Sequence, residues 1–305
     1  MRLRLTSARA RYLPLTETTI RLSVFLTVFG IMALAETVLP RRTRSLLRRR
    51  RWPGNLSLVL LDSVAARFLI PGTALATAAL AADRGWGLLS FVHLPVRIEF
   101  VIAVVVLDLA IYAQHVASHA LPFLWKVHRV HHTDLDLDVT SGLRFHPVEI
   151  VLSMWWKLCV ILLLGPSPTA VLVFEIVLNA SALFNHSNLA LPERIDSWLR
   201  RLVVTPDMHR IHHSVIAQET HSNFGFNLSC WDRLFRTYRN TPAAGQTGMT
   251  IGLPEWKSER DVQPLLAMLL MPAKDARPLV APEANTPEAH QTPEYPDGRT
   301  FQRGP

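Results

Sequence analysis

The chain has 305 residues, of which 49% are hydrophobic and 18% charged, and its formal net charge at pH 7 is +8. The apolar residues come in long blocks, which is typical of a polytopic membrane protein and argues against ordinary soluble domains. No basic groove with interleaved aromatic residues is evident, so nucleic acid is not an expected partner. Two cysteines, Cys159 and Cys230, supply neither a disulfide framework nor a thiolate metal site.

The first apolar block, residues 20–39, has about the length that a helix needs to cross a bilayer. Pro40 ends this block, and seven arginines follow between residues 41 and 51. We interpret these arginines as a cytoplasmic anchor beside a membrane span. Five arginines among residues 1–21 oppose that orientation, so the charges alone leave the direction of the first span open.

Four further apolar blocks follow along the chain. Residues 56–82 contain a Pro-Gly pair that is expected to kink the helix, and residues 100–121 run into the first histidines. Residues 148–164 and 169–183 flank a Gly-Pro turn and are predicted to form a hairpin of spans. These blocks predict an all-α, polytopic helical membrane protein. An even number of crossings separates the arginines from the histidines, so we expect a histidine-rich helical cap on the cytoplasmic side.

Histidines are concentrated in the middle of the chain, since eleven of the thirteen lie between residues 115 and 221. One H-x-x-x-H motif and two H-x-x-H-H motifs contain His115, His119, His128, His131, His132, His209, His212 and His213. Positions i, i+3 and i+4 share one face of a helix, so each triplet is expected to point its three rings at one spot. Such repeated clusters beside apolar spans are hard to explain by packing, and they predict a metal site.

The number of histidines indicates more than one metal ion. Eight imidazoles exceed the four or so ligands that one zinc ion takes, so two metals with about four imidazoles each, and an open position, fit the count. Imidazole suits iron, zinc and copper, and ligand type does not choose among them. The H-E-x-x-H motif of the common zinc proteases is absent from the sequence.

Carboxylates near the histidines suggest two different roles. Asp108 lies seven residues before His115, on the same predicted helix face, and we expect it to accept the second ring N–H of a ligating histidine. After the first triplet, Asp134, Asp136 and Asp138 alternate with other residues, which favours an exposed extended segment over a set of metal ligands.

The order of the three histidine motifs, set among paired apolar spans, resembles the fatty acid hydroxylase/sterol desaturase superfamily, especially its bacterial members. Further stretches that add to the resemblance are L143-R-F-H-P-V-E149, N185-H-S-N188, T205-P-D-M-H-R-I-H-H-S214, N223-F-G-F226 and W231-D-R-L-F-R-T-Y238. The resemblance covers roughly residues 95–240, which it implies are the catalytic domain. Residues 1–94 then supply N-terminal spans and a basic loop, and residues 241–305 form a polar, largely disordered tail.

This resemblance implies a membrane-embedded, non-haem di-iron centre, in which zinc can substitute for iron. The eight histidines of the three motifs carry over as ligands. His186 carries over as a ninth, although Ala190 stands where some relatives have a second histidine. His146, in the R-F-H-P motif, is expected near the substrate or behind a ligand, and His221 is left out of the ligand set.

The implied activity is the O₂-dependent hydroxylation or desaturation of a lipid such as a sterol or fatty acyl group. The chain carries no recognisable haem domain, flavin motif or iron–sulfur cysteine set, so electrons must come from a separate reductase or carrier. The expected location is a bacterial inner membrane. The alternatives are a histidine-rich membrane zinc hydrolase and a metal-binding or transport protein. A haem-binding quinol oxidoreductase would use widely separated histidines instead of adjacent pairs.

Overall fold

The computed structural model describes residues 6–274, with residues 6–16 described by their backbone alone. Over this part of the chain the fold is all-α and contains no β-strand, as predicted. The α-helices are α1 (Thr6–Val38), α2 (Arg48–Leu69), α3 (Ala74–Arg84), α4 (Val96–Ala120), α5 (Pro122–His132), α6 (Pro147–Leu164), α7 (Pro168–His186), α8 (Glu193–Leu199), α9 (Pro206–His212), α10 (Ala217–Thr220), α11 (Cys230–Leu234), α12 (Gly245–Gly248), α13 (Glu259–Val262) and α14 (Leu265–Leu270). Short 3₁₀ helices are η1 (Leu88–Phe91), η2 (Ser141–Leu143) and η3 (Met271–Ala273).

The long helices form a bundle with the dimensions of a membrane domain. Within the described residues, the segments long and apolar enough to cross a bilayer are Glu17–Val38, Arg48–Phe91, Pro147–Leu164 and Pro168–His186. The second of these comprises α2, α3 and η1, and the kink expected around Pro71 is a complete break between α2 and α3. Helix α4 covers the predicted third block and packs against α6 and α7, but it is not among these four segments.

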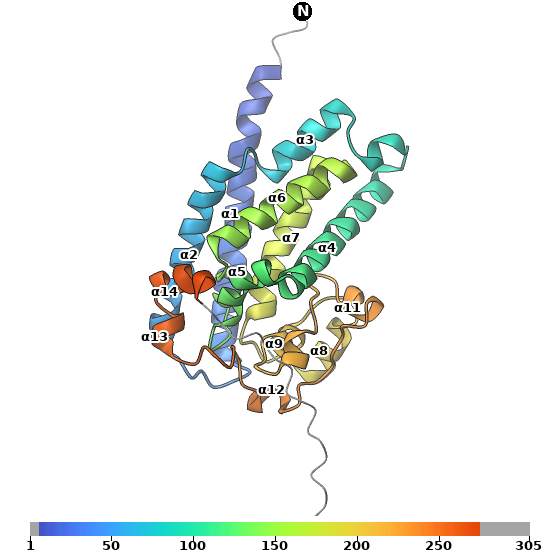
Figure 1. Ribbon diagram of the computed structural model, residues 1–305. Helices are drawn as coiled ribbons and strands as arrows, with labels where there is room; N and C mark the ends of the chain where they lie inside the picture. The colour runs from blue at the N-terminus through green and yellow to red at the C-terminus, as the bar shows by residue number, and fades with distance from the viewer. Residues whose placement is uncertain (1–5, 275–305) are drawn as a thin grey trace, which may run out of the picture.

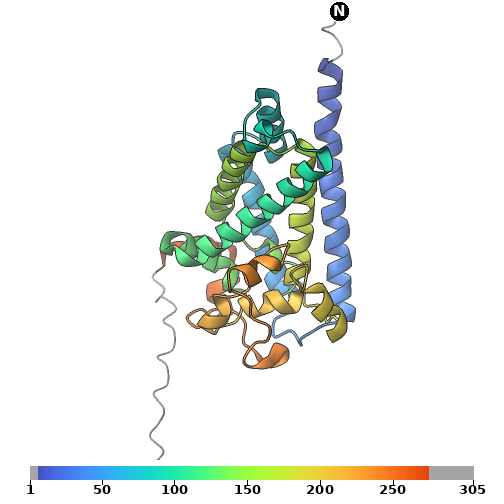
Figure 2. The ribbon, with the colours of Figure 1, turned by 90° about the vertical axis from the view of Figure 1, so that its right-hand side faces the viewer.

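Apolar residues hold the bundle together. Leu107 and Ile111 of α4 contact Leu158 and Ile161 of α6 and Phe174 of α7 in one buried cluster. Helix α1 stands along one edge of the bundle, as Figure 2 shows, and packs against α7.

The tight turn between α6 and α7 depends on Gly165. Its φ of 69° lies in the left-handed region, and a Cβ there would lie 2.3 Å from the Trp86 carbonyl oxygen. Only glycine allows this close approach, which lets the hairpin turn back and carry α7 to the end of the bundle where α6 began.

The shorter helices cap one end of the bundle (Figures 1 and 2). Helix α5 and helices α8 to α14 lie there, together with the segment that joins α1 to α2. Helices α4 and α7 end at this cap, so the histidine motifs of α4, α5, α7 and α9 all meet at one end of the molecule.

The arginine-rich segment is part of the cap and not a loose membrane anchor. Arg41 pairs with Asp207 at 2.8 Å, and Arg42 donates to the Met249 carbonyl oxygen at 2.6 Å. Arg51 is fully buried. Because these cations bind the protein itself, their number does not reveal the side of the membrane, and the cytoplasmic orientation stays a prediction.

The prediction that Asp134, Asp136 and Asp138 are exposed is wrong, since all three are buried. Asp134 and Asp138 accept hydrogen bonds from Arg51, at 2.6 Å each. Asp136 accepts from the backbone N–H and hydroxyl of Ser45 at 2.7 and 2.8 Å. The alternating carboxylates are therefore partners of the arginine-rich segment, which lies almost a hundred residues earlier in the chain.

Residues 241–274, which belong to the segment predicted to be a polar, largely disordered tail, are folded against the cap. Arg129 donates to the carbonyl oxygens of Met271 and Lys274 at 2.5 and 2.6 Å, and Arg144 donates to that of Val262 at 2.5 Å. The rest of the predicted tail, residues 275–305, lies outside the described residues.

Candidate metal centre

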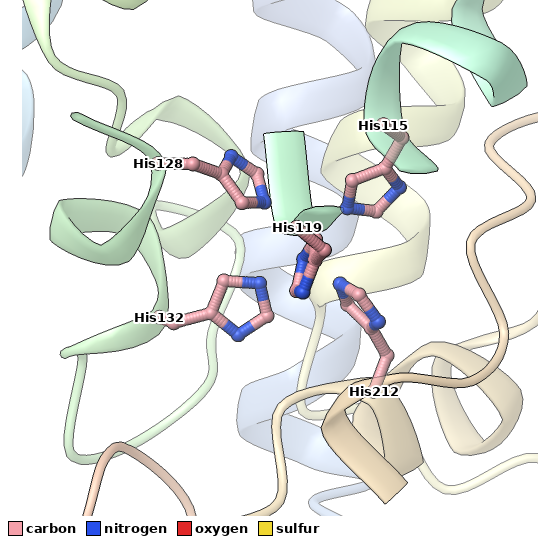
Figure 3. A group of neighbouring side chains, drawn as sticks. All are labelled: His115, His119, His128, His132 and His212. Carbon is pink, nitrogen blue, oxygen red and sulfur yellow. The ribbon is translucent and has the colours of Figure 1, made fainter. Parts of the chain in front are cut away.

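Nine histidines converge where the bundle meets the cap. They form two groups, and within each group one ring nitrogen per residue lies within 4.8 Å of all the others. The first group is His115, His119, His128, His132 and His212; the second is His131, His186, His209 and His213. All nine are buried. Figure 3 shows the first group, whose rings point at one another from α4, α5 and α9.

Each histidine triplet is divided between the two groups. In α5, His128 and His132 are four residues apart and join the first group, whereas His131 joins the second. Adjacent residues on a helix point about 100° apart, so His131 and His132 reach different groups. The expectation that each triplet points at one spot is therefore wrong, and each H-H pair instead bridges two sites.

The second triplet divides in the same way, since His209 and His213 join the second group and His212 joins the first. The spacing within the second group fits one metal ion. The Nε2 atom of His186 lies 3.1 Å from Nε2 of His131 and 3.0 Å from Nε2 of His209. His213 Nε2 lies 3.3 Å from His209 Nε2. Two nitrogens that bind the same ion at about 2.0–2.1 Å are roughly 3.0–3.4 Å apart, depending on coordination geometry.

The buried ring nitrogens lack other partners. Among the described residues, neither nitrogen of His119 or His132 has a hydrogen-bond partner, nor does Nε2 of His128 or His212. Such atoms are costly to bury unless something binds them. Burial, together with the neighbouring imidazoles, holds the pKa of His132 well below its ordinary value. The pKa values of His131, His209, His212 and His213 are lowered in the same way. Neutral imidazoles with free lone pairs are the form that binds a metal.

The outer nitrogens of several rings are held in place. Nδ1–H of His115 donates to the Phe224 carbonyl oxygen at 2.8 Å, and Nδ1–H of His212 donates to that of Ser222 at 2.8 Å. These bonds come from the N-F-G-F region and leave each Nε2 facing inward. The backbone of that segment therefore orients rings of the first group, the role that such partners play in metal sites.

The carboxylate that orients a histidine is Glu149, and not Asp108 as predicted. Glu149 accepts from Nδ1–H of His128 at 2.6 Å. Asp108 instead accepts from the indole N–H of Trp231 at 2.8 Å and from the backbone N–H of Leu228 at 3.2 Å. No described hydrogen bond joins Asp108 to a histidine, because its side chain faces the segment that holds α11. Glu149 was missed, although it ends the R-F-H-P-V-E stretch that contributed to the resemblance.

His146 belongs to neither group of histidines. Its Nδ1 accepts from the Val148 backbone N–H at 3.2 Å, which caps α6, and its Nε2–H donates to the Leu269 carbonyl oxygen at 3.2 Å. In this structure it joins α6 to α14. His221, which was left out of the ligand set, also belongs to neither group, although its ring centroid lies 5.5 Å from that of His119.

A cavity of about 410 Å³ lies beside the histidines, between helices of the bundle. Residues of α1, α2, α4, α6 and α7 line it, together with His115, His128 and His131. Its volume lies in the range typical of small-molecule sites. The cavity thus connects the interior of the helical bundle to both groups of histidines.

Replacing Glu149 by glutamine should weaken metal binding by the first group roughly 10–100-fold, since the neutral amide is a poorer acceptor for the His128 ring. The measurement is metal retention against a competing chelator. Glu255→Gln, at an exposed position, makes the same chemical change away from the site and should leave retention unchanged. Equal retention in both variants would contradict an orienting role for Glu149.

The chain is similar in sequence to known lipid-modifying enzymes. Residues 100–237 match the fatty acid hydroxylase family. The chain is 29% identical over 157 residues to the ornithine lipid hydroxylase OlsE of Rhizobium tropici, which covers 52% of this chain and 46% of that protein. It is 26% identical to the alkylglycerol monooxygenase of Xenopus tropicalis and 25% identical to that of Homo sapiens, each over 43% of this chain and 28% of the relative. The matches thus span less than half the length of these relatives. No solved structure matches the chain.

Proposed function

We propose that this chain, a member of the fatty acid hydroxylase/sterol desaturase superfamily through its residues 100–237, is a membrane-bound, non-haem di-iron oxidoreductase. It hydroxylates or desaturates a lipid with O₂ and with electrons from an external reductase. The catalytic domain comprises residues 95–240. The observation that carries the proposal is the division of nine buried histidines into groups of five and four beside one cavity.

The two groups fit a pair of metal ions. Each offers at least four imidazoles, and buried ring nitrogens in both lack any other described partner. A di-iron centre held there would activate O₂ for attack on an unactivated C–H bond. Imidazole also binds zinc, and divalent affinities do not favour iron, so zinc can occupy the same site in overexpressed protein.

The protein's own residues would position the lipid and exclude water. The cavity is lined by helices long and apolar enough to cross a bilayer, and the lipid would enter it laterally from the bilayer. The carbonyl groups of Phe224 and Ser222 and the carboxylate of Glu149 would hold the ligating rings in a fixed orientation during turnover. The proposed location is a bacterial inner membrane, with the cap in the cytoplasm.

Isotope labelling tests the reaction type. Membranes that contain the protein, a reductase system and their own lipids are incubated under ¹⁸O₂, and the lipids are profiled by mass spectrometry. A hydroxylated product should carry one ¹⁸O atom from O₂, whereas a desaturated product should carry none while O₂ is still consumed. Membranes without the protein are the control. A reaction that proceeds under strict anaerobiosis without an electron donor would contradict the proposal and favour the alternative, a zinc hydrolase. Metal binding without any lipid product would favour a metal-binding or transport protein.

A further inference from the structure

More acidic than basic side chains line the cavity beside the histidines. Its charged residues, apart from the histidines, are Asp62, Glu149, Lys157 and Glu175. Lys157 pairs with Glu175 at 2.5 Å, and Arg21 of α1 pairs with the other oxygen of the same carboxylate at 2.7 Å. The carboxylate of Glu175 is therefore fully compensated by cations of the protein.

The carboxylate of Asp62 has no such cationic partner among the described residues. It lies in α2, lines the cavity, and is only 9% exposed. No hydrogen bond or ion pair joins it to any described residue, and its Oδ1 atom is buried without a partner. Glu149, which lines the same cavity, holds His128 with one oxygen, while its other oxygen is also buried without a partner.

Two carboxylates that line the same cavity, each with an oxygen that has no partner, favour a cation. A buried carboxylate is costly unless it is paired, and an ionisable residue in a membrane span commonly marks a substrate pathway. No cation among the described residues pairs with Asp62, because Lys157 and Arg21 form ion pairs with Glu175. A ligand that brings its own positive charge would remove the cost.

We propose that Asp62 binds a protonated amine in the polar headgroup of the lipid substrate, with Glu149 contributing to the same anionic wall. This proposal rests on the proposed function in taking the cavity as the substrate site. It makes Asp62 a specificity-determining residue, which selects lipids that carry an amine over lipids of the same length with an uncharged headgroup.

Binding of simple probes tests this without turnover. The purified, metal-loaded protein in a non-ionic detergent is titrated at pH 7 with dodecylamine and with N-acetyldodecylamine, which has the same chain but no charge. Wild type should bind the amine about tenfold more tightly or better, because a buried charge pair forms only with the amine. Asp62→Asn should remove this preference, and Asp62→Glu should restore part of it.

Asp83→Asn is the matched control. Asp83 is exposed at the end of α3, so its substitution changes the net charge equally and leaves the cavity intact. It should keep the wild-type preference for the amine. If Asp62→Asn also keeps it, or weakens both probes equally, the proposal is overturned.

Measurements of stability and kinetics distinguish amine binding by Asp62 from a structural role and from proton delivery. Asp62→Asn should keep or raise the Tm, because it removes an unpaired buried carboxylate. A Tm several degrees lower would show an internal partner and overturn the proposal.

With amine-bearing lipids the Asp62→Asn variant should have a higher KM and an unchanged kcat, whereas an equal fall in kcat on charged and uncharged lipids would indicate proton delivery instead. A preference for the amine in a protein that never consumes O₂ would refute the proposed function and the role of Asp62 in substrate selection, and would leave only amine binding by Asp62.

Discussion

Replacing His212 or His131 by alanine is expected to abolish O₂-dependent turnover while the protein stays inserted in the membrane. His212 belongs to the first group and His131 to the second, so each variant removes one ligand from a different site. The spans do not depend on either residue, because both lie in the cap. Loss of His131 leaves three imidazoles in the second group, and loss of His212 leaves four of five in the first, so metal affinity falls at the affected site and falls further in the His131 variant.

Metal analysis distinguishes the two sites. Wild-type protein made under iron-replete conditions should contain about two metal ions per chain, the His131 variant should approach about one, and the His212 variant should fall below two. His93→Ala serves as the control, because His93 is exposed and lies outside both groups. A wild-type ratio near one, or two ions retained in both variants, would contradict the division into two sites.

Replacing Arg51 by methionine should destabilise the cap by about 3–5 kcal/mol, because it leaves two buried carboxylates without their cation. Arg51 donates to Asp134 through both Nε and Nη2, at 2.9 and 2.6 Å, and to Asp138 through Nη1 at 2.6 Å. Although burial alone would raise the pKa of Asp134, the guanidinium groups of Arg51 and Arg144 hold it well below its ordinary value. Both aspartates belong to the segment that directly follows the histidines of α5.

The neighbouring residue provides the matched comparison for Arg51. Arg50 is exposed and pairs with Glu259 at 3.0 Å on the surface, so Arg50→Met should cost about 1 kcal/mol or less. Thermal unfolding in detergent and metal content are measured for both variants. Similar losses in Arg50→Met and Arg51→Met would show that the buried cluster does not support the cap.

The amino-acid pattern by itself determined the helical membrane architecture and the histidines that meet. Apolar block length predicts spans, and i, i+4 spacing predicts that His115 joins His119 and that His128 joins His132; these are local properties that the helix repeat controls. The kink near Pro71 follows from the same local chemistry.

The pairing of distant segments is visible only in the folded chain. The assignment of His131 and His132 to different groups depends on which rings arrive from α7 and α9. The choice of Glu149 over Asp108 as the partner of a histidine, and of Arg51 as the partner of Asp134, joins side chains many residues apart in the sequence. Charge pairing has no sequence period, so a run of arginines that serves the cap looks the same as one that anchors a membrane span. The lack of a partner for Asp62 likewise becomes visible only when the partners of the nearby cations, Lys157 and Arg21, are known.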